Sequence, residues 1–383
     1  KRLTLILTIL VAAASCTLSA ADAPKRHGWD NKTPLYGNVE SVTVTGYYFK
    51  DSLGVLSRSK IGRSCYKFNE SGDVTEKADY IQDSSLIWKF INKYDSKGNV
   101  TEAAWYDSDG SLNSKEIYKY DTQGNKTEEA KYDSDGSLDN KYIYKYDTKG
   151  NVTEVARYTS AGSLDNKWIF KYDTKGNKTE EAKYDSDGSL DYKSIYKYDT
   201  KGNETEYAKY TSDGSLDYKY IYKYDTQGNK TEEAVYASDG SLIWKGTYKY
   251  DTKGNKTEEA VYALYGSFEN KFIYKYDSKG NVTEEAVYTS DKKYIYKYDT
   301  KGNMTEEAMY ASDSSLMWKV IYKYDTQGNK TEEAEYDSKG SLRRKEIYKY
   351  KYDSKGNKTE MTLYKGKMQI PESQTVYTII YRK

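Results

Sequence analysis

The chain has 383 residues and carries 60 Lys and Arg against 59 Asp and Glu, which gives a formal net charge of +1. This balance removes the main argument for nucleic-acid binding, because phosphate neutralisation needs a surplus of basic side chains, and no nucleic-acid partner is expected. Tyr accounts for 46 residues, Phe for 6 and Pro for 3, so the composition predicts a folded chain without a thick aliphatic core.

The first residues have the pattern of an export signal. A basic pair precedes an apolar run over residues 3–14, and small residues follow up to Ala21. These are the regions of a secretory signal peptide, and the apolar run is too short to span a bilayer. A signal over 1–21 would leave a mature chain from Asp22. Alternatively, the residues that end at Cys16 resemble a bacterial lipobox, with the signal ending at 15 and a lipid on Cys16.

Both interpretations predict an exported protein that is extracellular, periplasmic or on the outer-membrane surface. Contact with a membrane is expected only through a lipid on Cys16. A flexible leader over 22–35 and an N-terminal β cap over 36–64 are expected to precede the repeats. Cys65 has no Cys partner in either case, so no intrachain disulfide is expected.

The middle of the chain repeats one short phrase. Tyr-Asp-x-x-Gly-Asn recurs every 26 residues from Asp95 to Asp277, and after a step of 22 residues it continues from Asp299. With one weaker copy before Asp95, about twelve units fill residues 65–365, and a C-terminal β cap is expected over 366–383. A fixed period in this range is typical of a stacked repeat array.

Each unit is predicted to contain two strands and two turns. In the unit that starts at Asp121, residues 126–132 and 138–146 form the strands, and Gly-containing segments form the turns. Tyr, Thr and Ile at a period of two favour strand over helix. The predicted fold class is therefore all-β, an array of antiparallel β-hairpins that forms a coiled or spiral, single-layer sheet. A flat ribbon and a six-bladed propeller are the open alternatives.

The Ser-Asp-Gly turn of this unit also predicts a register. Pairing across it sets Lys131 opposite Asp139 and Glu129 opposite Lys141. Alternation puts the Tyr residues of the second strand on one face, and a column of Ala, as at Ala130, is expected beside them. The other face carries Lys, Glu and one Ile per unit. Such a sheet is expected to coil with its Tyr face inside.

At this point the residues carry a family resemblance. Tyr-x-Tyr-Asp-x-x-Gly-Asn, as at residues 144–151, resembles the YD repeat of the RHS family, and the match covers about residues 66–364. Residues 35–43 are similar to the entry segments of secreted Bacteroidetes proteins built from such repeats. The resemblance implies a spiral β-sheet, often a shell and sometimes around a C-terminal toxin. Because the repeats run almost to Lys383, only the scaffold is expected here.

The second turn of each unit has the spacing of a calcium loop. Residues 133–139 read Asp-Ser-Asp-Gly-Ser-Leu-Asp, which offers several carboxylates. Other units replace the first Asp by Thr159 or Ala237, whereas the Gly is nearly always present. That pattern is typical of a turn, so no metal site and no cofactor are expected.

Aromatic side chains are the stronger functional lead. Three units have Trp seven residues before the repeat Asp, two others have Tyr there, and one further Trp lies two residues along the same face. Rings edged by Asp, Asn and Lys suit stacking on sugars. The alternative is that these rings cover the interior of the coil. The candidate ligand-binding residues are Trp88, Trp168, Trp244, Trp318, Tyr192 and Tyr218.

Enzyme chemistry has little support in the sequence. Every pair of carboxylates belongs to a repeated column, whereas catalysis needs one unique constellation with shifted pKa values. The sequence therefore predicts a non-catalytic, secreted or surface-anchored repeat protein that binds a carbohydrate or cell-envelope glycan. The alternatives are a scaffold for adhesion or interaction with a surface protein, and a structural spacer. The RHS resemblance adds a toxin-delivery shell without its effector.

Overall fold

The computed structural model describes residues 35–52, 55–263, 267–366 and 371–382. The expected signal peptide, most of the expected leader and the lipidation candidate Cys16 lie outside these residues. Throughout the described part the chain forms β-strands joined by turns. It contains no helix with the length and apolar character that a membrane crossing requires.

The strands are β1 (Val39–Ser52), β2 (Val55–Phe68), β3 (Val74–Ile81), β4 (Leu86–Tyr94), β5 (Val100–Tyr106), β6 (Leu112–Tyr120), β7 (Lys126–Asp133), β8 (Leu138–Tyr146), β9 (Val152–Thr159), β10 (Leu164–Tyr172), β11 (Lys178–Asp185), β12 (Leu190–Tyr198), β13 (Glu204–Thr211), β14 (Leu216–Tyr224), β15 (Lys230–Ala237), β16 (Leu242–Tyr250), β17 (Lys256–Tyr262), β18 (Phe268–Tyr276), β19 (Val282–Tyr288), β20 (Lys292–Tyr298), β21 (Met304–Ala311), β22 (Leu316–Tyr324), β23 (Lys330–Asp337), β24 (Leu342–Tyr352), β25 (Lys358–Lys365) and β26 (Pro371–Tyr381).

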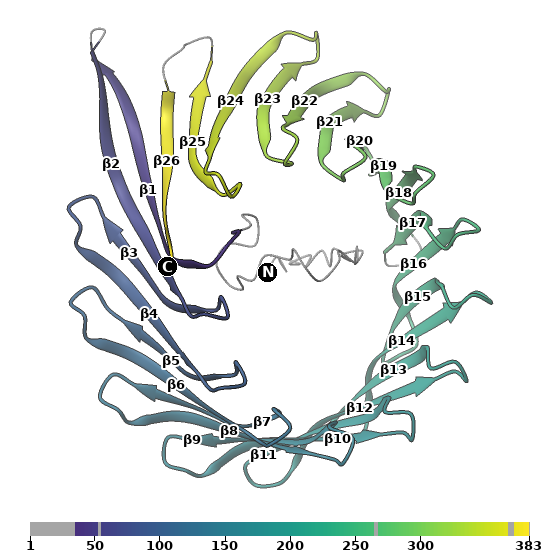
Figure 1. Ribbon diagram of the computed structural model, residues 1–383. Helices are drawn as coiled ribbons and strands as arrows, with labels where there is room; N and C mark the ends of the chain where they lie inside the picture. The colour runs from purple at the N-terminus through teal and green to yellow at the C-terminus, as the bar shows by residue number, and fades with distance from the viewer. Residues whose placement is uncertain (1–34, 53–54, 264–266, 367–370, 383) are drawn as a thin grey trace.

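All 26 strands belong to one antiparallel sheet, which closes on itself. Each strand pairs with its neighbours in the sequence, and β1 pairs with both β2 and β26. Figure 1 shows the result as a ring of hairpins that the chain follows once around. The predicted all-β array of hairpins in a coiled sheet is therefore confirmed. The propeller alternative is wrong, because a propeller needs several separate sheets.

The register within a hairpin differs from the prediction by one residue. Tyr132 faces Leu138, as the turn requires, but the pairing shifts directly beyond it, so that Lys131 faces Asn140 rather than Asp139. A β-bulge adds one residue to the second strand, and hydrophobic alternation alone does not reveal such an insertion. The Lys131–Asp139 ion pair nevertheless forms, with 3.2 Å between Nζ and Oδ2.

The shift moves the Ala column to the other face of the sheet. Glu129 faces Tyr142 instead of Lys141, and Ala130 faces Lys141. The predicted neighbourhood of Ala130 and the Tyr residues of the second strand is therefore wrong. The column packs under Lys and Ile, and its members are 5% exposed or less: Ala78, Ala104, Ala130, Ala156, Ala182, Ala208, Ala234, Ala260, Ala286, Ala308 and Ala334.

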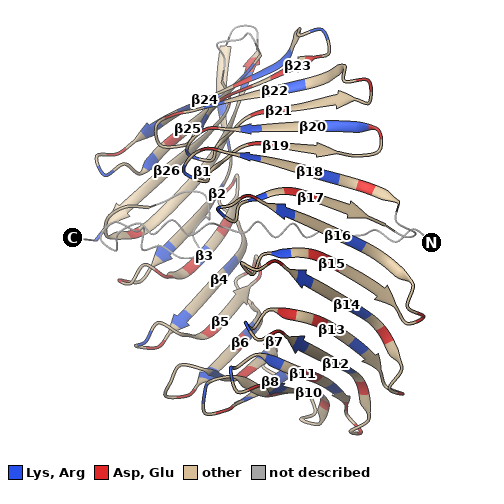
Figure 2. Ribbon diagram, turned by 90° about the vertical axis from the view of Figure 1, so that its right-hand side faces the viewer, with Lys and Arg blue, Asp and Glu red and all other residues tan. Residues whose placement is uncertain are grey.

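The two faces of the sheet have different chemistry. The aromatic face carries Tyr142, Tyr144 and their equivalents. The opposite Lys–Glu face carries ion pairs between Lys two residues before the repeat Asp and Glu seven after it, as in Lys145–Glu154 at 2.9 Å. Figure 2 shows how Lys and Arg alternate with Asp and Glu over the sheet. These Lys side chains are well exposed, so each pair contributes only ~0.2–1 kcal/mol and serves mainly to set the register.

The aromatic face lines the inside of the ring. The chirality of L-residues fixes the side to which a side chain points once strand direction and hydrogen-bonded neighbour are known. Odd-numbered strands bond to the next strand through residues of the aromatic face, since the backbone N of Asp133 donates to the carbonyl of Ser137, and Lys131 and Glu129 lie two and four residues before Asp133 on the same face. Together with the winding and strand directions in Figures 1 and 2, this places the aromatic face inside, as predicted.

The larger buried apolar side chains gather where the ring closes. Leu35, Val39, Val42, Phe68 and Val74 form a buried cluster between the first strands and β26. Elsewhere the buried hydrophobic residues are mostly Ala, because a single-layer sheet offers little depth. Closure of the ring thus depends on one local core rather than on a general one.

Candidate ligand-binding site

The Tyr-Asp-x-x-Gly-Asn phrase is explained by the turn that it forms. The Asp121 carboxylate accepts hydrogen bonds from the backbone N and the side-chain Nδ2 of Asn125, both at 2.9 Å. The hydrogen bond from the Asn125 side chain holds the pKa of Asp121 below its ordinary value. Gly124 has φ of +92°, a conformation that favours Gly. These residues stabilise the turn and leave the carboxylate engaged.

The Tyr of the phrase has an equally structural role. Tyr146 donates from its hydroxyl to the carbonyl of Lys126, 20 residues earlier, at 2.6 Å. That carbonyl lies where the pairing of β6 and β7 shifts register, so the hydroxyl satisfies a backbone group at an irregular point in the ladder. In the described residues nine units share this bond, with donors Tyr94, Tyr120, Tyr146, Tyr172, Tyr198, Tyr224, Tyr250, Tyr276 and Tyr324. In a tenth unit Tyr350, two residues before the Tyr of the phrase, makes the equivalent bond.

The second turn of each unit uses its carboxylates locally as well. Asp135 accepts from the backbone N of Ser137 at 2.8 Å, and hydrogen bonds from Ser137 hold the pKa of Asp135 below its ordinary value. Where the Gly is missing, Ser84 and Ser314 take the left-handed conformation instead, with φ of +75° and +67°. Within the described ranges no group of three or more His, Cys, Asp or Glu is placed to hold a metal ion.

Lys side chains lie between Tyr rings along the inside of the ring. Lys178 Nζ is 4.6 Å from the centre of the Tyr196 ring and 5.6 Å from that of Phe170, and it bonds to Glu181 at 2.7 Å. The same sandwich occurs around Lys230, between Tyr222 and Tyr248. Such contacts contribute about 0.5–2 kcal/mol each, so this column supports the sheet.

Glu204 occupies the position that Lys178 and Lys230 fill in the neighbouring units. Burial raises the pKa of Glu204 above its ordinary value of 4.5, and Glu233 adds to this effect. A carboxyl whose pKa is raised on folding costs stability as pH rises above its unfolded pKa, and the full cost is present above its folded pKa. We therefore expect Glu204→Gln to raise the melting temperature at pH 7. The gain in the free energy of unfolding should be less than about 1 kcal/mol, because the site is partly solvated.

The pH dependence distinguishes this effect from simple packing. The advantage of Glu204→Gln should disappear as pH falls to 4.5 and below, because the wild-type carboxyl is then protonated. Thermal melts of both proteins at pH 4 and pH 7 measure it. As a control, Glu206→Gln removes the partner of Lys197, at 2.8 Å on the Lys–Glu face, and should not stabilise at either pH. A gain for Glu204→Gln at both pH values would contradict the electrostatic cause.

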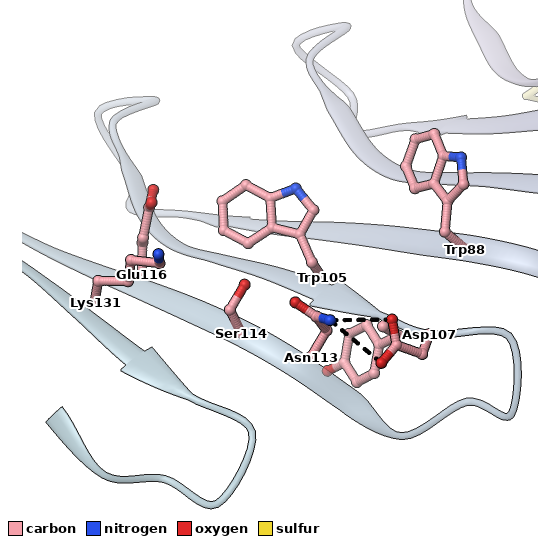
Figure 3. Close-up of a pocket in the computed structure, with 8 residues that line it drawn as sticks. Trp88, Trp105, Asp107, Asn113, Ser114, Glu116 and Lys131 are labelled. Atoms are coloured by element: carbon pink, nitrogen blue, oxygen red, sulfur yellow. Dashed lines mark hydrogen bonds between the residues drawn. The ribbon is translucent and has the colours of Figure 1, made fainter. Parts of the chain in front are cut away.

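A hollow of about 430 Å³ lies on the aromatic face between β4 and β7. Trp88 and Trp105 stand side by side over it, and Ser114 separates Trp105 from Lys131, as Figure 3 shows. Trp105 faces Ser114 across the β5–β6 pairing. Other units have larger residues at the position of Ser114, such as Tyr192, so a small side chain next to a large one creates the space.

Polar groups with fixed positions surround the two indoles. Asn113 donates from Nδ2 to both carboxylate oxygens of Asp107, at 3.1 and 3.2 Å. The Glu116 carboxylate accepts from the Tyr118 hydroxyl. Both carboxylates retain further acceptor capacity, since each oxygen has two lone pairs. The hollow thus combines an aromatic platform with oriented acceptors.

The structure distributes the predicted site residues over four places. Trp88 lines the hollow. Three others lie on alternate strands, β10, β12 and β14, and Lys side chains of the strands between connect them. Lys183 faces both Trp168 and Tyr192, and Lys209 stacks on both Tyr192 and Tyr218, at 4.9 and 5.8 Å.

Tyr192 is held within this second group. Burial, with a hydrogen bond to Glu181, raises the pKa of Tyr192 to about 12. Its hydroxyl lies 3.0 Å from Glu181 Oε1, so it is already engaged with the protein.

The two remaining candidates lie apart from the hollow. Trp244 faces Val235, and Trp318 faces Met309 and Asp337. All the candidate Trp residues are partly buried.

The sequence analysis missed Trp105. It lies ten residues after a repeat Asp, on the first strand of its unit, whereas the predicted site residues come from the second strand, most of them seven residues before the Asp. A register shift in the β4–β5 pairing, between Lys93 and Tyr94, brings these two columns onto one face, as the pairing of Phe90 with Trp105 shows. Their ring centroids are 5.0 Å apart. A search for Trp residues in neighbouring strands of one face would have found the pair.

Comparison with known proteins gives only distant structural neighbours. No family model matches the sequence, and no curated sequence is significantly similar to it. A TcdB2-TccC3-Cdc42 structure is 10% identical with a TM-score of 0.31, over 87% of this chain and 24% of that chain. This chain therefore spans about a quarter of that neighbour's length.

Two further neighbours cover most of both chains. A porin-like protein from Bacteroides uniformis is 11% identical with a TM-score of 0.19, over 89% of this chain and 96% of that one. The V. cholerae biofilm matrix protein Bap1 is 11% identical with a TM-score of 0.17, over 93% and 90%. With such TM-scores these likenesses assign neither a family nor an activity to this chain.

Proposed function

We propose that this protein is a non-catalytic, exported binding module whose ligand is a carbohydrate or cell-envelope glycan. The hollow under Trp88 and Trp105 carries the proposal. Two indoles of neighbouring strands present their rings on the inside of the ring of hairpins, next to the Asp107–Asn113 pair (Figure 3). Sugar rings have an apolar C–H face and a polar rim of hydroxyls, which this arrangement complements.

The polar groups at the hollow suit recognition better than catalysis. Asp107 is held by Asn113 and Glu116 by Tyr118, so both carboxylates are fixed as hydrogen-bond acceptors. A general acid would instead need a carboxyl kept protonated near neutral pH. The hydroxyls of a bound sugar would donate hydrogen bonds to these oxygens while the sugar ring stacks on an indole.

An adhesion or interaction scaffold with a surface protein as partner is the second candidate. Exposed apolar side chains at the β1–β2 hairpin favour it, above all Val55, at 69% exposed, and Ile61, at 55%. A structural spacer would need neither feature. A toxin-delivery shell follows only from the resemblance of the repeats to the RHS family.

The glycan proposal predicts a specific loss on removal of Trp105. A glycan array with the mature chain should identify a ligand, and titration calorimetry should then show at least about tenfold weaker binding by Trp105→Ala, which corresponds to ~1.4 kcal/mol. Trp318→Ala is the matched control, because Trp318 lies on the same face but faces Met309 and Asp337 instead of the hollow. Circular dichroism would check that both variants fold.

Two outcomes would contradict the proposal. One is a blank array with folded protein, which would favour the scaffold. The other is equal weakening by both substitutions, which would mean that Trp residues act through the stability of the sheet. In that case the hollow would lose its assigned role.

A further inference from the structure

The β1–β2 hairpin extends beyond its neighbours at the rim opposite the Tyr-Asp turns. β1 and β2 have 14 residues each, whereas β3 has 8. The pairing of β2 with β3 begins only at Gly62, which faces Ile81. Within the described residues, therefore, no strand pairs with the outer edge of β2 over Val55–Ile61. Figure 1 shows this hairpin rising past β3.

Among the described residues this edge is open in a sheet that otherwise closes, as is the end of β1 beyond its pairing with β26 at Tyr48. Closure removes free edges, and proteins usually blunt the remaining ones because an open row of backbone N–H and C=O groups recruits further strands. Here the edge is long, and it is flanked by exposed apolar side chains. Val55, Leu56 and Ile61 are 69%, 46% and 55% exposed.

A step in the rim provides room for another strand. The β3–β4 turn ends below the hairpin, and a hollow of about 640 Å³ lies between them, lined by Ile61, Ile81, Gln82 and Asp83. Ile81 is 47% exposed. An added strand would lie alongside Val55–Ile61 and bury both Ile side chains.

The charge of the edge selects the chemistry of the partner. Val55–Ile61 contains Arg58 and Lys60 and no acidic residue. Arg58 stacks on Tyr47, with 3.5 Å to the ring centre, and Lys60 donates to Ser84 Oγ at 3.3 Å, so both cations are held beside the edge. Acidic side chains on an incoming strand would meet them across the pair.

Several pairings of this edge with a second copy of the chain would oppose like charges. A parallel pairing of two copies would set Arg58 beside Arg58 and Lys60 beside Lys60. An antiparallel pairing centred on Arg58 would again oppose the two Arg side chains. Like charges directly opposite each other destabilise a sheet.

We infer that Val55–Ile61 of β2 is a docking edge for an extended segment of another protein, in which apolar and acidic residues alternate. The segment would add a strand to the sheet through backbone hydrogen bonds, and its apolar side chains would cover Ile61 and Ile81. This inference is independent of the glycan site, which lies on the inside of the ring between β4 and β7.

Labelled peptides test the inference with the intact mature protein. The probe is a blocked peptide of sequence Val-Glu-Val-Glu-Val-Thr-Val, and the comparison peptide has Lys in place of Glu. Fluorescence anisotropy should show binding of the Glu peptide at least about tenfold tighter than that of the Lys peptide at low salt. Hydrogen exchange should show slower exchange of the Val55–Ile61 amides in the complex.

A charge reversal makes the test decisive. The double variant Arg58→Glu/Lys60→Glu replaces one exposed and one half-buried side chain and should reverse the preference, so that the Lys peptide binds more tightly. Absence of binding, absence of reversal, or protection confined to other strands would overturn the inference. A doubled mass in light scattering, with the edge protected without peptide, would also overturn it and assign the edge to a second copy.

Discussion

Substitution of Asn357 by Ala is expected to lower the free energy of unfolding by about 3 kcal/mol. Asn357 is fully buried and joins the two ends of the sheet. Its Oδ1 accepts from the backbone N of Tyr36 at 2.6 Å, and its Nδ2 donates to the Tyr36 carbonyl at 2.9 Å and to the Tyr381 hydroxyl at 2.6 Å. Ala would remove the partner of the Tyr36 backbone N–H and carbonyl, and one of two partners of the Tyr381 hydroxyl, at the place where β1 meets β26.

The equivalent Asn of an internal unit provides the control. Asn255 makes side-chain bonds only within its own turn, to Asp251 at 2.9 Å, so Asn255→Ala should cost about 1 kcal/mol. Urea unfolding measures both values. Faster hydrogen exchange in β1 and β26, seen in Asn357→Ala alone, would identify opening of the seam. Equal destabilisation by the two substitutions would contradict a special role of Asn357 in closure.

Substitution of Gly62 by Ala is expected to cost about 2–3 kcal/mol, for a steric reason. A Cβ atom at Gly62 would lie 2.5 Å from the backbone carbonyl oxygen of Tyr80, closer than non-bonded atoms approach. Because that oxygen belongs to the neighbouring strand, β2 and β3 would have to separate locally. The free energy of unfolding, again from urea titration, measures the cost.

Gly46 is a closely matched control for this effect. It faces Gly62 across the β1–β2 pair, but a Cβ there would meet only the Ile61 side chain, at 3.9 Å. Gly46→Ala should therefore change stability by less than about 1 kcal/mol. A similar loss for both variants would show that backbone freedom, and not the contact with Tyr80, decides the need for Gly at this bulge.

Local chemistry made the repeat unit predictable from the sequence. The strands expected over 126–132 and 138–146 are confirmed as β7 and β8, because Gly at the turns and Tyr, Thr and Ile at a period of two act within a few residues. The separation of a Tyr face from a Lys–Glu face follows from the same alternation. The candidate Trp residues could be recognised as a column, but the hollow could not.

The tertiary structure alone decided the register, the closure and the grouping of side chains into a site. The bulge between Lys131 and Tyr132 depends on hydrogen bonds between strands, and it transfers Ala130 to the opposite face. A separate shift in the β4–β5 pairing, between Lys93 and Tyr94, brings Trp105 onto the face of Trp88. Closure sums small rotations over 26 strands before β1 meets β26, so no single unit encodes it. The sequence by itself determined what each hairpin is, since turns and alternation are local. Only the assembled ring determined that, within the described part of the chain, Val55–Ile61 of β2 has no neighbouring strand on its outer edge and which side chains share a hollow.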